Sequence, residues 1–458
     1  MKNTLRSRQD EDVSCGSYFM HVPKLLLSYL TGAVLTGLVS ILSTFLLTRM
    51  LSPAAYGEGM LFVSILNCLF FLCNFGMDQV FVRHFYEPSY KDKLPLLLYR
   101  CISLVLLNAV IVFLILALTG VAKPFFSTFH IQHFSNWFYY LPIGTLLFVF
   151  LRFSLLIPRL LEKPKVYSAA NFINESFFLG SALLFIDYGH KNANTIIYAE
   201  LLAMASVVCW LVIIYRKQWS LFTMRYDTLF EWVETKSFLQ YGFPFIFSLS
   251  LTWVFNNIDK FMLLKWSNLY ELGIYTAAFN LAWPLVMLQS VFTTVWAPKM
   301  NQLLISNAEE AKIAFIKTFR NTAWILTLGA LALIFLKKII VLFLGTHFRA
   351  AADIFPWLLF MPYFYALSEI TVAGIVKSKK SIWNIPISLI CLVTNLIGCY
   401  FLIPKLGAKG AAIAVATSFA VFFIMRTSIA FQYYRFKISY IELIFLASVL
   451  FFIVDTSS

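Results

Sequence analysis

Long apolar runs recur along this chain, and they constrain its fold more than any other feature. From Leu25 onward, stretches with almost no charge extend for about 20 residues, which at about 1.5 Å per residue is enough to cross a hydrocarbon core of about 30 Å. Of the 458 residues, 60% are hydrophobic and 13% are charged, whereas a water-soluble globular chain has about a quarter charged residues. The sequence therefore predicts an all-α polytopic membrane protein and excludes a soluble enzyme.

Charge, proline and glycine divide the apolar sequence into about twelve predicted membrane-spanning helices. They are expected near residues 25–48, 57–81, 95–119, 137–158, 166–187, 195–215, 241–264, 272–296, 321–344, 352–376, 382–404 and 409–431. A further apolar stretch at 439–454 is short, so it is either a partial additional span or a helix that lies at the membrane interface.

The cations of the chain follow the predicted topology. A formal net charge of +14 would suggest a polyanionic partner in a soluble protein. If the N-terminus is cytoplasmic, however, 25 of the 36 Lys and Arg residues fall in inside segments and 9 in outside segments, with Arg152 and Lys260 within spans. Because Lys and Arg accumulate on the cytoplasmic side of membrane proteins, this distribution predicts a cytoplasmic N-terminus. It also accounts for most of the basic excess without a polyanionic partner such as nucleic acid.

The motifs of the sequence indicate neither a cofactor nor a metal site nor an enzyme. The 7 cysteines form no CxxC pair, and the phosphate-binding motif GxxxxGK[ST] does not occur. The longest predicted outside loop, about residues 120–136, is too short for a periplasmic domain. This weighs against a membrane glycan polymerase.

The longest predicted inside loop divides the helices into two sets of six. We expect a cytoplasmic N-terminal tail at 1–24, an N-terminal lobe at 25–215, a linker at 216–240, a C-terminal lobe at 241–431 and a tail at 432–458. A shift of 216 residues aligns FLLTRMLSPAAYG (45–57) with FMLLKWSNLYELG (261–273) without a gap, so that Gly57 meets Gly273. Because each set has an even number of spans, the two repeats should have the same orientation, related by an axis along the membrane normal.

Three segments resemble the polysaccharide flippase family, the lipid-linked oligosaccharide exporters of the multidrug/oligosaccharidyl-lipid/polysaccharide superfamily. They are LLTRMLSPAAYGEGMLFVSILN (46–67), FGMDQVFVRHFYE (75–87) and NNIDKFMLLKWSNLYELGIYTAAFNLA (256–282). The resemblance covers the whole chain in the number and order of spans. It implies two six-helix lobes that form a V around a central cavity and work by alternating access.

The same resemblance implies a substrate and a location. The cargo would be undecaprenyl-diphosphate-linked oligosaccharide, such as the O-antigen repeat unit of lipopolysaccharide. It would move from the cytoplasmic to the periplasmic leaflet of the bacterial plasma membrane. The implied partners are the lipid bilayer, a coupling proton or sodium ion, and a polysaccharide polymerase with its chain-length machinery.

Polar residues inside the predicted fifth helix are the first candidates for a binding site. A charge within a span costs about 2.5 to 3.5 kcal/mol on insertion scales, so it needs water, a partner or an escape route. Asn171, Asn174 and Glu175 are spaced i, i+3 and i+4, which places them on one helical face near the midplane. This stripe either lines a cavity, where it would bind sugar hydroxyls or a coupling cation, or forms hydrogen bonds between helices.

Arg152, in the predicted fourth helix, lies at a depth comparable to that of Asn171. Its planar guanidinium can donate two hydrogen bonds at once, which suits the diphosphate of the implied cargo. Two other interpretations are open: the side chain extends to the cytoplasmic interface, or it only neutralises Glu175.

The predicted seventh helix carries a second polar group, Asn256, Asp259 and Lys260, about two-thirds of the way toward the outside. Lys260 would meet the diphosphate as it exits, with Asp259 holding the ammonium. Alternatively, the group is a salt-bridge latch between the lobes or an outer gate cap without substrate contact.

Two further places in the sequence carry acids within predicted spans. Glu369 lies in the tenth helix with Tyr363 and Tyr365 nearby, and it either lines the cavity or has a structural role. Asp78 and Arg83 are five residues apart at the inside end of the second helix, a spacing that does not favour a pair on one face. We expect them to be interface anchors.

Two other functions stay open beside the flippase. A drug or organic-cation antiporter of the same superfamily would use acids such as Glu175 to exchange a proton or a sodium ion for cationic cargo. A membrane glycan polymerase would lengthen the glycan on the outer face.

Overall fold

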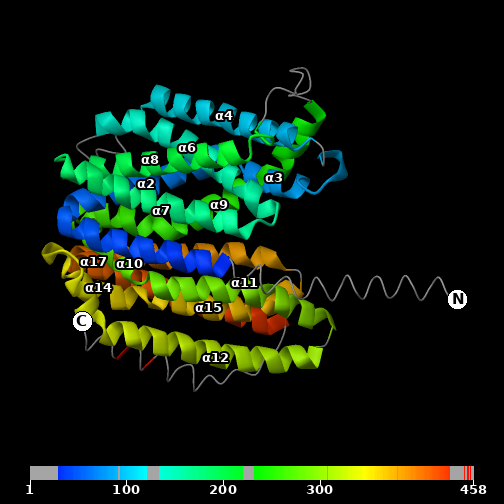
Figure 1. The fold of residues 1–458 in the computed structure, drawn as a ribbon. Coiled ribbons are helices and arrows are strands. Elements are labelled where there is room, and N and C mark those ends of the chain that lie inside the picture. Colours follow the sequence, from blue (N-terminus) through cyan, green and yellow to red (C-terminus); the bar gives the residue numbers. More distant parts are fainter. Residues whose placement is uncertain are drawn as a thin grey trace.

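The computed structural model is a bundle of long helices, and every element of its described part is helical. The structure describes residues 29–90, 93–120, 134–219, 232–306, 308–378 and 380–433, together with 448, 451, 452 and 454. Figure 1 shows most of the long helices running along one common direction in two stacked groups. Nine helices of the described part are long and apolar enough to cross a membrane, or ten if one bent pair is counted as a single span. The protein is a multi-pass membrane protein.

The N-terminal half has helix ends that coincide with local sequence signals. Its elements are Tyr29–Met50, α2 (Pro53–Asn74), α3 (Met77–His84), the 3-10 turn η1 (Pro88–Tyr90), α4 (Leu94–Thr119), α6 (Phe134–Leu160), α7 (Pro164–Asp187) and α8 (Ala193–Ile214). Ser52 caps α2 by accepting a hydrogen bond from the backbone N–H of Ala55. Pro53 occupies the first helical position, where no N–H is needed. The cap and the proline allow the chain to reverse within two residues.

A sharp break separates α2 from α3. Phe75 and Gly76 have φ angles of 51° and 70°, the left-handed conformation in which helices commonly end. The continuous span predicted at 57–81 is therefore two helices. The break gives α3 its own direction and brings it into contact with α4, α6 and α9.

The C-terminal half contains more short elements. They are α9 (Trp232–Trp266), α10 (Leu269–Leu281), α11 (Trp283–Ser306), α12 (Ala308–Phe335), α13 (Lys337–Leu342), η3 (Thr346–Phe348), α14 (Ala351–Leu358), α15 (Phe360–Thr371), α16 (Ala373–Lys377), η4 (Ser381–Trp383) and α17 (Asn384–Tyr433). α10 and the first part of α11 form a pair bent by 47°. α17 is also interrupted, because Gly407 has φ 55° and ψ −132°, so two helices meet at this residue.

The number of candidate spans differs from the twelve predicted. α9, which includes the span predicted at 241–264, is not among the nine. α17 counts once, although its 50 residues would extend about 75 Å if straight. α9 also begins at Trp232, inside the predicted linker, and most of the stretch at 439–454 lies outside the described residues. The count of twelve stays a prediction.

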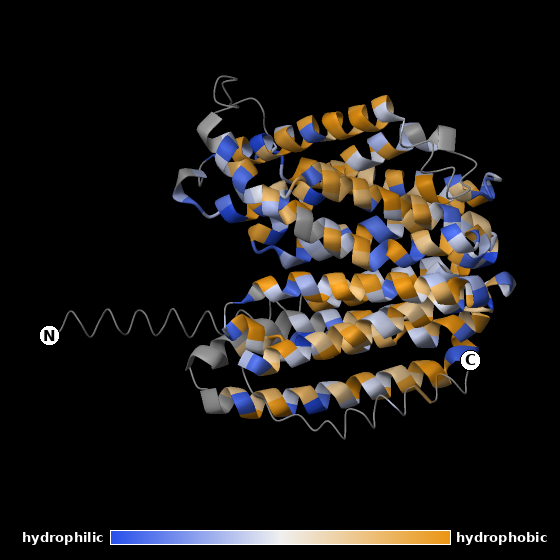
Figure 2. Cartoon of the chain, turned by 180° about the vertical axis from the view of Figure 1, so that it is seen from behind, coloured by the Kyte–Doolittle hydropathy of each residue, from blue (hydrophilic) through white to orange (hydrophobic). Residues whose placement is uncertain are grey.

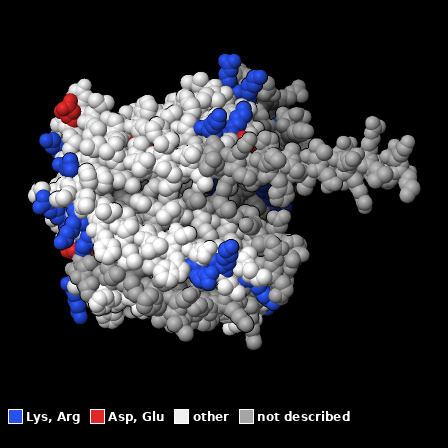
Figure 3. Space-filling model, turned by 60° about the horizontal axis from the view of Figure 1, so that its bottom comes forward, with Lys and Arg blue, Asp and Glu red and all other residues white. Residues whose placement is uncertain are grey.

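The surface of the bundle suits a lipid environment. Figure 2 shows apolar residues along the middle of the helices and hydrophilic ones mainly toward their ends. On the face drawn in Figure 3, Lys and Arg gather in a few groups, and most of the described surface carries no charge. Large apolar side chains such as Leu118 and Ile213 are 78% and 72% exposed. Such a surface is unfavourable in water and matches a hydrocarbon core.

The two halves approach each other very closely where α2 and α10 begin. A Cβ atom on Gly57 would lie 2.5 Å from the carbonyl oxygen of Leu269 and 2.6 Å from the backbone nitrogen of Gly273. A Cβ atom on Gly273 would in turn overlap the carbonyl oxygen of Pro53. The contact is reciprocal, since the shift of 216 residues relates Gly57 to Gly273 and Pro53 to Leu269. This reciprocity supports the predicted internal repeat.

The same shift relates the caps of these two helices. Ser52 accepts from the N–H of Ala55 at 3.3 Å, and Asn268 accepts from the N–H of Glu271 at 2.9 Å. Both are the N-cap residues of their helices, α2 and α10. Local structure thus repeats together with the sequence.

A second contact between the halves involves the N-terminal end of α9. The guanidinium of Arg83 in α3 lies 4.3 Å from the ring centroid of Tyr241, and the rings of His84 and Phe238 are 4.8 Å apart. A Cβ atom on Gly76 would lie 2.6 Å from the carbonyl oxygen of the residue that follows Tyr241. Arg83 is therefore an anchor between helices, and α9 contacts the N-terminal half through α3.

Candidate transport site

Arg152 on α6 forms an ion pair with Asp78 on α3. Its Nη2 and Nε atoms donate to the same carboxylate oxygen, Oδ2, at 2.8 and 3.2 Å. The Asp78 side chain is only 3% exposed and also accepts from the side chain of Asn74 and from the backbone and side chain of Gln79. Among the described residues, the partner of Arg152 is thus Asp78, where the sequence suggested Glu175. The Arg152 side chain is 37% exposed, and its Nη1 group makes no hydrogen bond within the described part of the chain.

The polar stripe on α7 makes no hydrogen bond to another helix within the described residues. The amide of Asn171 donates to the carbonyl oxygen of Tyr167 in its own helix, at 2.9 Å. The Oδ1 atom of Asn174 is buried without a hydrogen-bond partner. Glu175 has no ion pair in the described structure, and it interacts electrostatically with Glu200 on the adjacent helix α8. Two acids without a described basic partner therefore lie near each other in membrane-spanning helices.

The polar group on α9 is divided between exposed and buried positions. Asn256 is exposed. Asp259 is 3% exposed and accepts a hydrogen bond from the hydroxyl of Tyr275 on α10. The sequence suggested that Asp259 would hold Lys260. In the structure these neighbours have different hydrogen-bond partners, as expected for adjacent residues on a helix.

Lys260 reaches from the C-terminal half to the N-terminal half. Its Nζ atom donates to Oδ1 of Asn257 at 3.0 Å and to the hydroxyl of Ser64 on α2 at 3.3 Å. The ammonium also lies 5.9 Å from the ring centroid of Phe279. Lys260 is thus part of the contact between the halves. It makes this contact through the hydroxyl of Ser64, whereas one interpretation of the sequence was a salt-bridge latch between the lobes.

A matching contact lies on the other side of the same interface. The side-chain amide of Asn280 donates to the hydroxyls of Thr44 at 3.1 Å and Tyr56 at 3.0 Å. The shift of 216 residues relates Thr44 to Lys260 and Ser64 to Asn280. The Asn280–Thr44 and Lys260–Ser64 contacts are therefore equivalent positions of the two repeats. We call these four residues the interlobe polar pairs.

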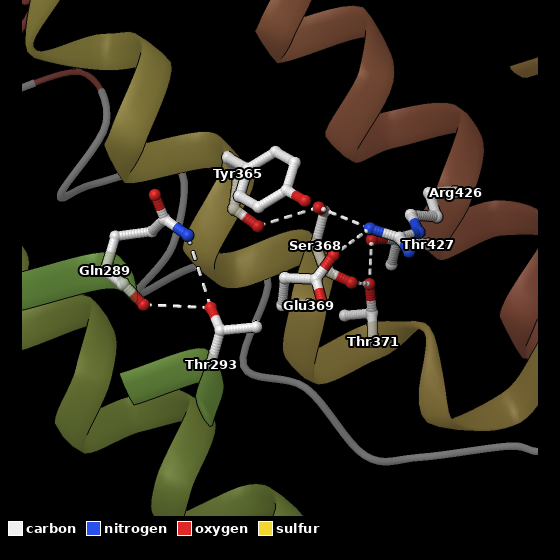
Figure 4. A network of polar contacts seen from close by, with 8 residues as sticks. All are labelled: Gln289, Thr293, Tyr365, Ser368, Glu369, Thr371, Arg426 and Thr427. Atoms are coloured by element: carbon white, nitrogen blue, oxygen red, sulfur yellow. Dashed lines mark hydrogen bonds and ion pairs between the residues drawn. The ribbon is translucent and has the colours of Figure 1, made fainter. Parts of the chain in front are cut away.

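Glu369 on α15 pairs with Arg426 on α17. Nη1 of Arg426 lies 2.6 Å from Oε1 of Glu369 and 3.1 Å from the hydroxyl of Ser368, and the two charged side chains are 10% and 13% exposed. Figure 4 shows this network, in which the hydroxyls of Thr371 and Thr427 also meet, at 2.9 Å. Arg426, assigned from the sequence to the cytoplasmic face, is therefore buried within α17. The pair joins α15 to the second part of α17.

Most partners in these clusters did not emerge as site candidates from the sequence. They include Asp78, Glu200, Tyr275 and Arg426, and the residues that join Lys260 at the interlobe contact, Thr44, Tyr56, Ser64 and Asn280. For Glu200 and Arg426 a signal existed, because both fall inside predicted spans. Asp78 was predicted to be an interface anchor. Its pairing with Arg152 depends on the break before α3, which gives this helix its own direction. Nothing in the sequence distinguishes Tyr275 from other buried tyrosines.

The chemistry that these groups offer is binding. Arg152 and Lys260 can hold an anion, and Glu175 and Glu200 can hold a proton or a cation. Within the described residues, no group of three His, Cys, Asp or Glu side chains could hold a metal ion. Charged groups of both signs inside membrane-spanning helices, at and beside the contact of two related halves, are typical of membrane transporters.

The chain belongs to the polysaccharide biosynthesis protein family, whose model matches residues 24–304. This confirms the family predicted from the sequence. The proteins of known structure that share the fold include transporters of the multidrug/oligosaccharidyl-lipid/polysaccharide (MOP) superfamily.

Solved structures share the fold over nearly the whole chain. The lipid II flippase MurJ in an inward closed conformation has a TM-score of 0.70 and 14% identity, with 93% of this chain and 91% of that chain covered. An inward-facing multidrug resistance MATE family transporter of the MOP superfamily gives 0.63 and 14%, with 94% and 100% covered. A MOP superfamily transporter from Pyrococcus furiosus gives 0.57 and 15%, with 90% and 94% covered. At these identities the likeness shows the fold alone; no curated protein sequence matches the chain.

Proposed function

We propose that this protein is a flippase that moves undecaprenyl-diphosphate-linked oligosaccharide from the cytoplasmic to the periplasmic leaflet of the bacterial plasma membrane. The family supports a role in surface polysaccharide biosynthesis, and the fold likeness to a lipid II flippase supports a lipid-linked cargo. The observation that carries the proposal is Arg152, a half-exposed cation within a membrane-spanning helix whose guanidinium is only partly engaged.

The geometry of Arg152 suits a diphosphate. Asp78 takes the side edge of the guanidinium, formed by Nε and Nη2. The end of the guanidinium, formed by Nη1 and the second N–H of Nη2, is left to bind another anion. Two parallel N–H groups of this kind match two oxygens of a phosphate, which a lysine ammonium cannot do. Asp78 thus holds the fork in place while leaving donors for the cargo.

We propose that Glu175 and Glu200 form the coupling site for a proton or a sodium ion. Their carboxylates interact across α7 and α8 without a basic partner in the described part of the chain. Two like charges in this setting repel each other, and a bound proton or cation relieves the repulsion. Binding and release of that ion would therefore change the relative stability of two conformations.

The proposed transport cycle uses the predicted architecture. Two six-helix lobes, at 25–215 and 241–431, would form a V around a central cavity and open alternately to the two sides, with the N-terminus in the cytoplasm. The reciprocal contacts of α2 and α10 support two lobes related by a repeat. A polysaccharide polymerase and its chain-length machinery would use the exported units on the outer face.

Deleting the gene tests the function directly. We expect loss of surface polysaccharide and accumulation of lipid-linked repeat units on the inner leaflet, where they are protected from an impermeant glycosidase added to spheroplasts. The wild-type gene should reverse both effects. Unchanged polysaccharide with altered drug tolerance would overturn the proposal in favour of an antiporter. Single units on the outer face that do not lengthen would overturn it in favour of a polymerase.

Arg152→Lys tests the site, because it keeps the charge and loses the fork. Arg159→Lys is the matched control, since Arg159 is exposed in the last turn of the same helix. We expect Arg152→Lys to lose most export at equal protein level and Arg159→Lys to retain it. Full export by Arg152→Lys would exclude a bidentate role.

The coupling site is tested in reconstituted vesicles. We expect Glu175→Gln and Glu200→Gln each to remove the dependence of transport on a proton or sodium gradient. Glu162→Gln, at a turn between α6 and α7, is the control and should keep that dependence. Gradient-dependent transport in both variants would exclude this pair as the coupling site.

A further inference from the structure

The interlobe polar pairs lie at one level of the bundle. Thr44 and Lys260 each precede the last residue of their helix by six positions, and Ser64 and Asn280 each follow the first residue of their helix by eleven. At about 1.5 Å per residue these positions lie about 9 and 16 Å from the end where α2 and α10 begin. In the predicted topology this is the outer end. The pairs therefore lie below the reciprocal glycine contact.

The two layers together hold the two halves in contact at this end of α2 and α10. At the upper layer, Gly57 and Gly273 leave no space even for a Cβ atom. At the lower layer, Thr44 and Ser64 are 3% and 6% exposed. A cargo with a diphosphate and sugars cannot pass between α2 and α10 while these contacts hold, so they must separate for release to the outside.

All donors in the lower layer belong to the C-terminal half. The ammonium of Lys260 and the amide of Asn280 donate, and the hydroxyls of Ser64, Thr44 and Tyr56 in the N-terminal half accept. When the halves separate, one wall therefore carries an ammonium that keeps Asn257 but has lost Ser64, and an amide that has lost both of its hydroxyl acceptors. Groups of this kind bind phosphate oxygens.

We propose that the interlobe polar pairs and Tyr56 form an outer gate. In the closed gate, hydroxyl oxygens accept the hydrogen bonds of Lys260 and Asn280, and in the open gate the phosphate oxygens of the cargo take the place of these hydroxyls. The identity of the cargo rests on the proposed function, and the existence of the gate does not. The hydroxyls serve as stand-ins for phosphate oxygens, so the open gate exchanges one set of acceptors for another. Gate opening thereby costs less when cargo is present, because the donors are satisfied in both states.

Cysteine accessibility from the outside tests the gate without any cargo. Thr44→Cys and Ser64→Cys serve as buried reporters, and Tyr188→Cys, where Tyr188 is 81% exposed after α7, is the positive control. The native cysteines are replaced, and labelling uses a membrane-impermeant maleimide. Each reporter is combined with a substitution in the other polar pair, Lys260→Met with Thr44→Cys and Asn280→Ala with Ser64→Cys.

We expect each combination to raise the labelling rate of the reporter about tenfold, the factor for losing one hydrogen bond that holds a closed state. Lys265→Met is the matched control, since Lys265 is exposed on the same helix near its end, and it should leave labelling unchanged. Lys260→Arg keeps a charged donor and should keep the reporter protected. Equal labelling with Lys260→Met and Lys265→Met, or reporters labelled as fast as Tyr188→Cys at the outset, would overturn the gate.

The exchange of acceptors is tested by adding farnesyl diphosphate to the Thr44→Cys protein. We expect faster labelling with farnesyl diphosphate and no change with farnesol, and the response should be lost in Lys260→Met. Inorganic pyrophosphate tests whether the headgroup alone is recognised. If it accelerates labelling as much as farnesyl diphosphate does, the headgroup is sufficient; if it does not, the lipid is also required. An equal response to farnesol would overturn the diphosphate exchange, and normal polysaccharide in the deletion strain would overturn only the proposed function.

Discussion

Replacing Arg152 should destabilise the protein more than replacing Asp78, although the two residues form one ion pair. The Asp78 side chain is 3% exposed and that of Arg152 is 37% exposed. In Arg152→Gln a buried carboxylate loses its counter-charge and keeps only the hydrogen bonds from Asn74 and Gln79. Removing one partner of a buried pair costs about 3 to 5 kcal/mol of stability. Because Asp78 keeps its remaining hydrogen bonds, we expect Arg152→Gln to lower the free energy of unfolding by about 3 kcal/mol. In Asp78→Asn, water can reach the guanidinium, so the loss should be about 1 kcal/mol.

The measurement is the free energy of unfolding of the purified protein, followed by titration with SDS. The double variant Asp78→Asn/Arg152→Gln should be more stable than Arg152→Gln alone by about 1 to 2 kcal/mol, because it contains no uncompensated buried charge. Arg159→Gln, on the exposed end of the same helix, should stay within about 0.5 kcal/mol of wild type. If the two single losses are equal, or if they simply add in the double variant, the reasoning from burial is refuted.

Three further substitutions test the packing. Gly273→Ala should abolish export and expose the outer end to impermeant label, because its Cβ atom overlaps a carbonyl oxygen of α2, whereas Gly180→Ala, with open space around it, should export normally. Glu369→Gln should lower the free energy of unfolding by about 3 kcal/mol, because it leaves Arg426 buried beside a neutral partner; a change under about 1 kcal/mol would contradict this. Arg49→Met removes hydrogen bonds to two carbonyl oxygens at the end of α13, on an exposed surface. The free energy of unfolding should therefore fall by about 1 kcal/mol at most. A larger loss would mean that this contact holds the halves together.

The sequence was informative about helices and about the repeat for simple physical reasons. Backbone groups in a membrane must be satisfied within a helix, so apolar length alone marks most spans. The alignment of Gly57 with Gly273 relied on short motifs, and the structure explains why both positions are glycine, since each lies against the backbone of the other repeat. Close approach of two backbones leaves a mark in the sequence because few residue types tolerate it.

Partners across helices could not be predicted in the same way. Arg152 was recognised as a charge within a span, but its pairing with Asp78 depends on a left-handed residue, Phe75, that separates α3 from α2. The adjacent Gly76, also left-handed, is only a weak signal for such a break, and the left-handed conformation of a non-glycine residue gives none in a single sequence. Arg426 was counted among the cations of the cytoplasmic side, and that count gave no indication that its side chain is buried against Glu369.

The two repeats differ at their shared interface in which of them carries the hydrogen-bond donors and which the acceptors. Identical residues in both repeats would place the same groups on both walls of an opening gate. Instead Lys260 and Asn280 on the C-terminal side donate to hydroxyls on the N-terminal side. The acids that interact within the N-terminal half, Glu175 and Glu200, lie on α7 and α8. At the gate the anionic cargo would therefore be held by the C-terminal half, after it has left Arg152 in the N-terminal half, which also carries the two acids. In that arrangement the symmetry of the fold supplies the motion, and the differences between the repeats determine which half binds the anion at the gate.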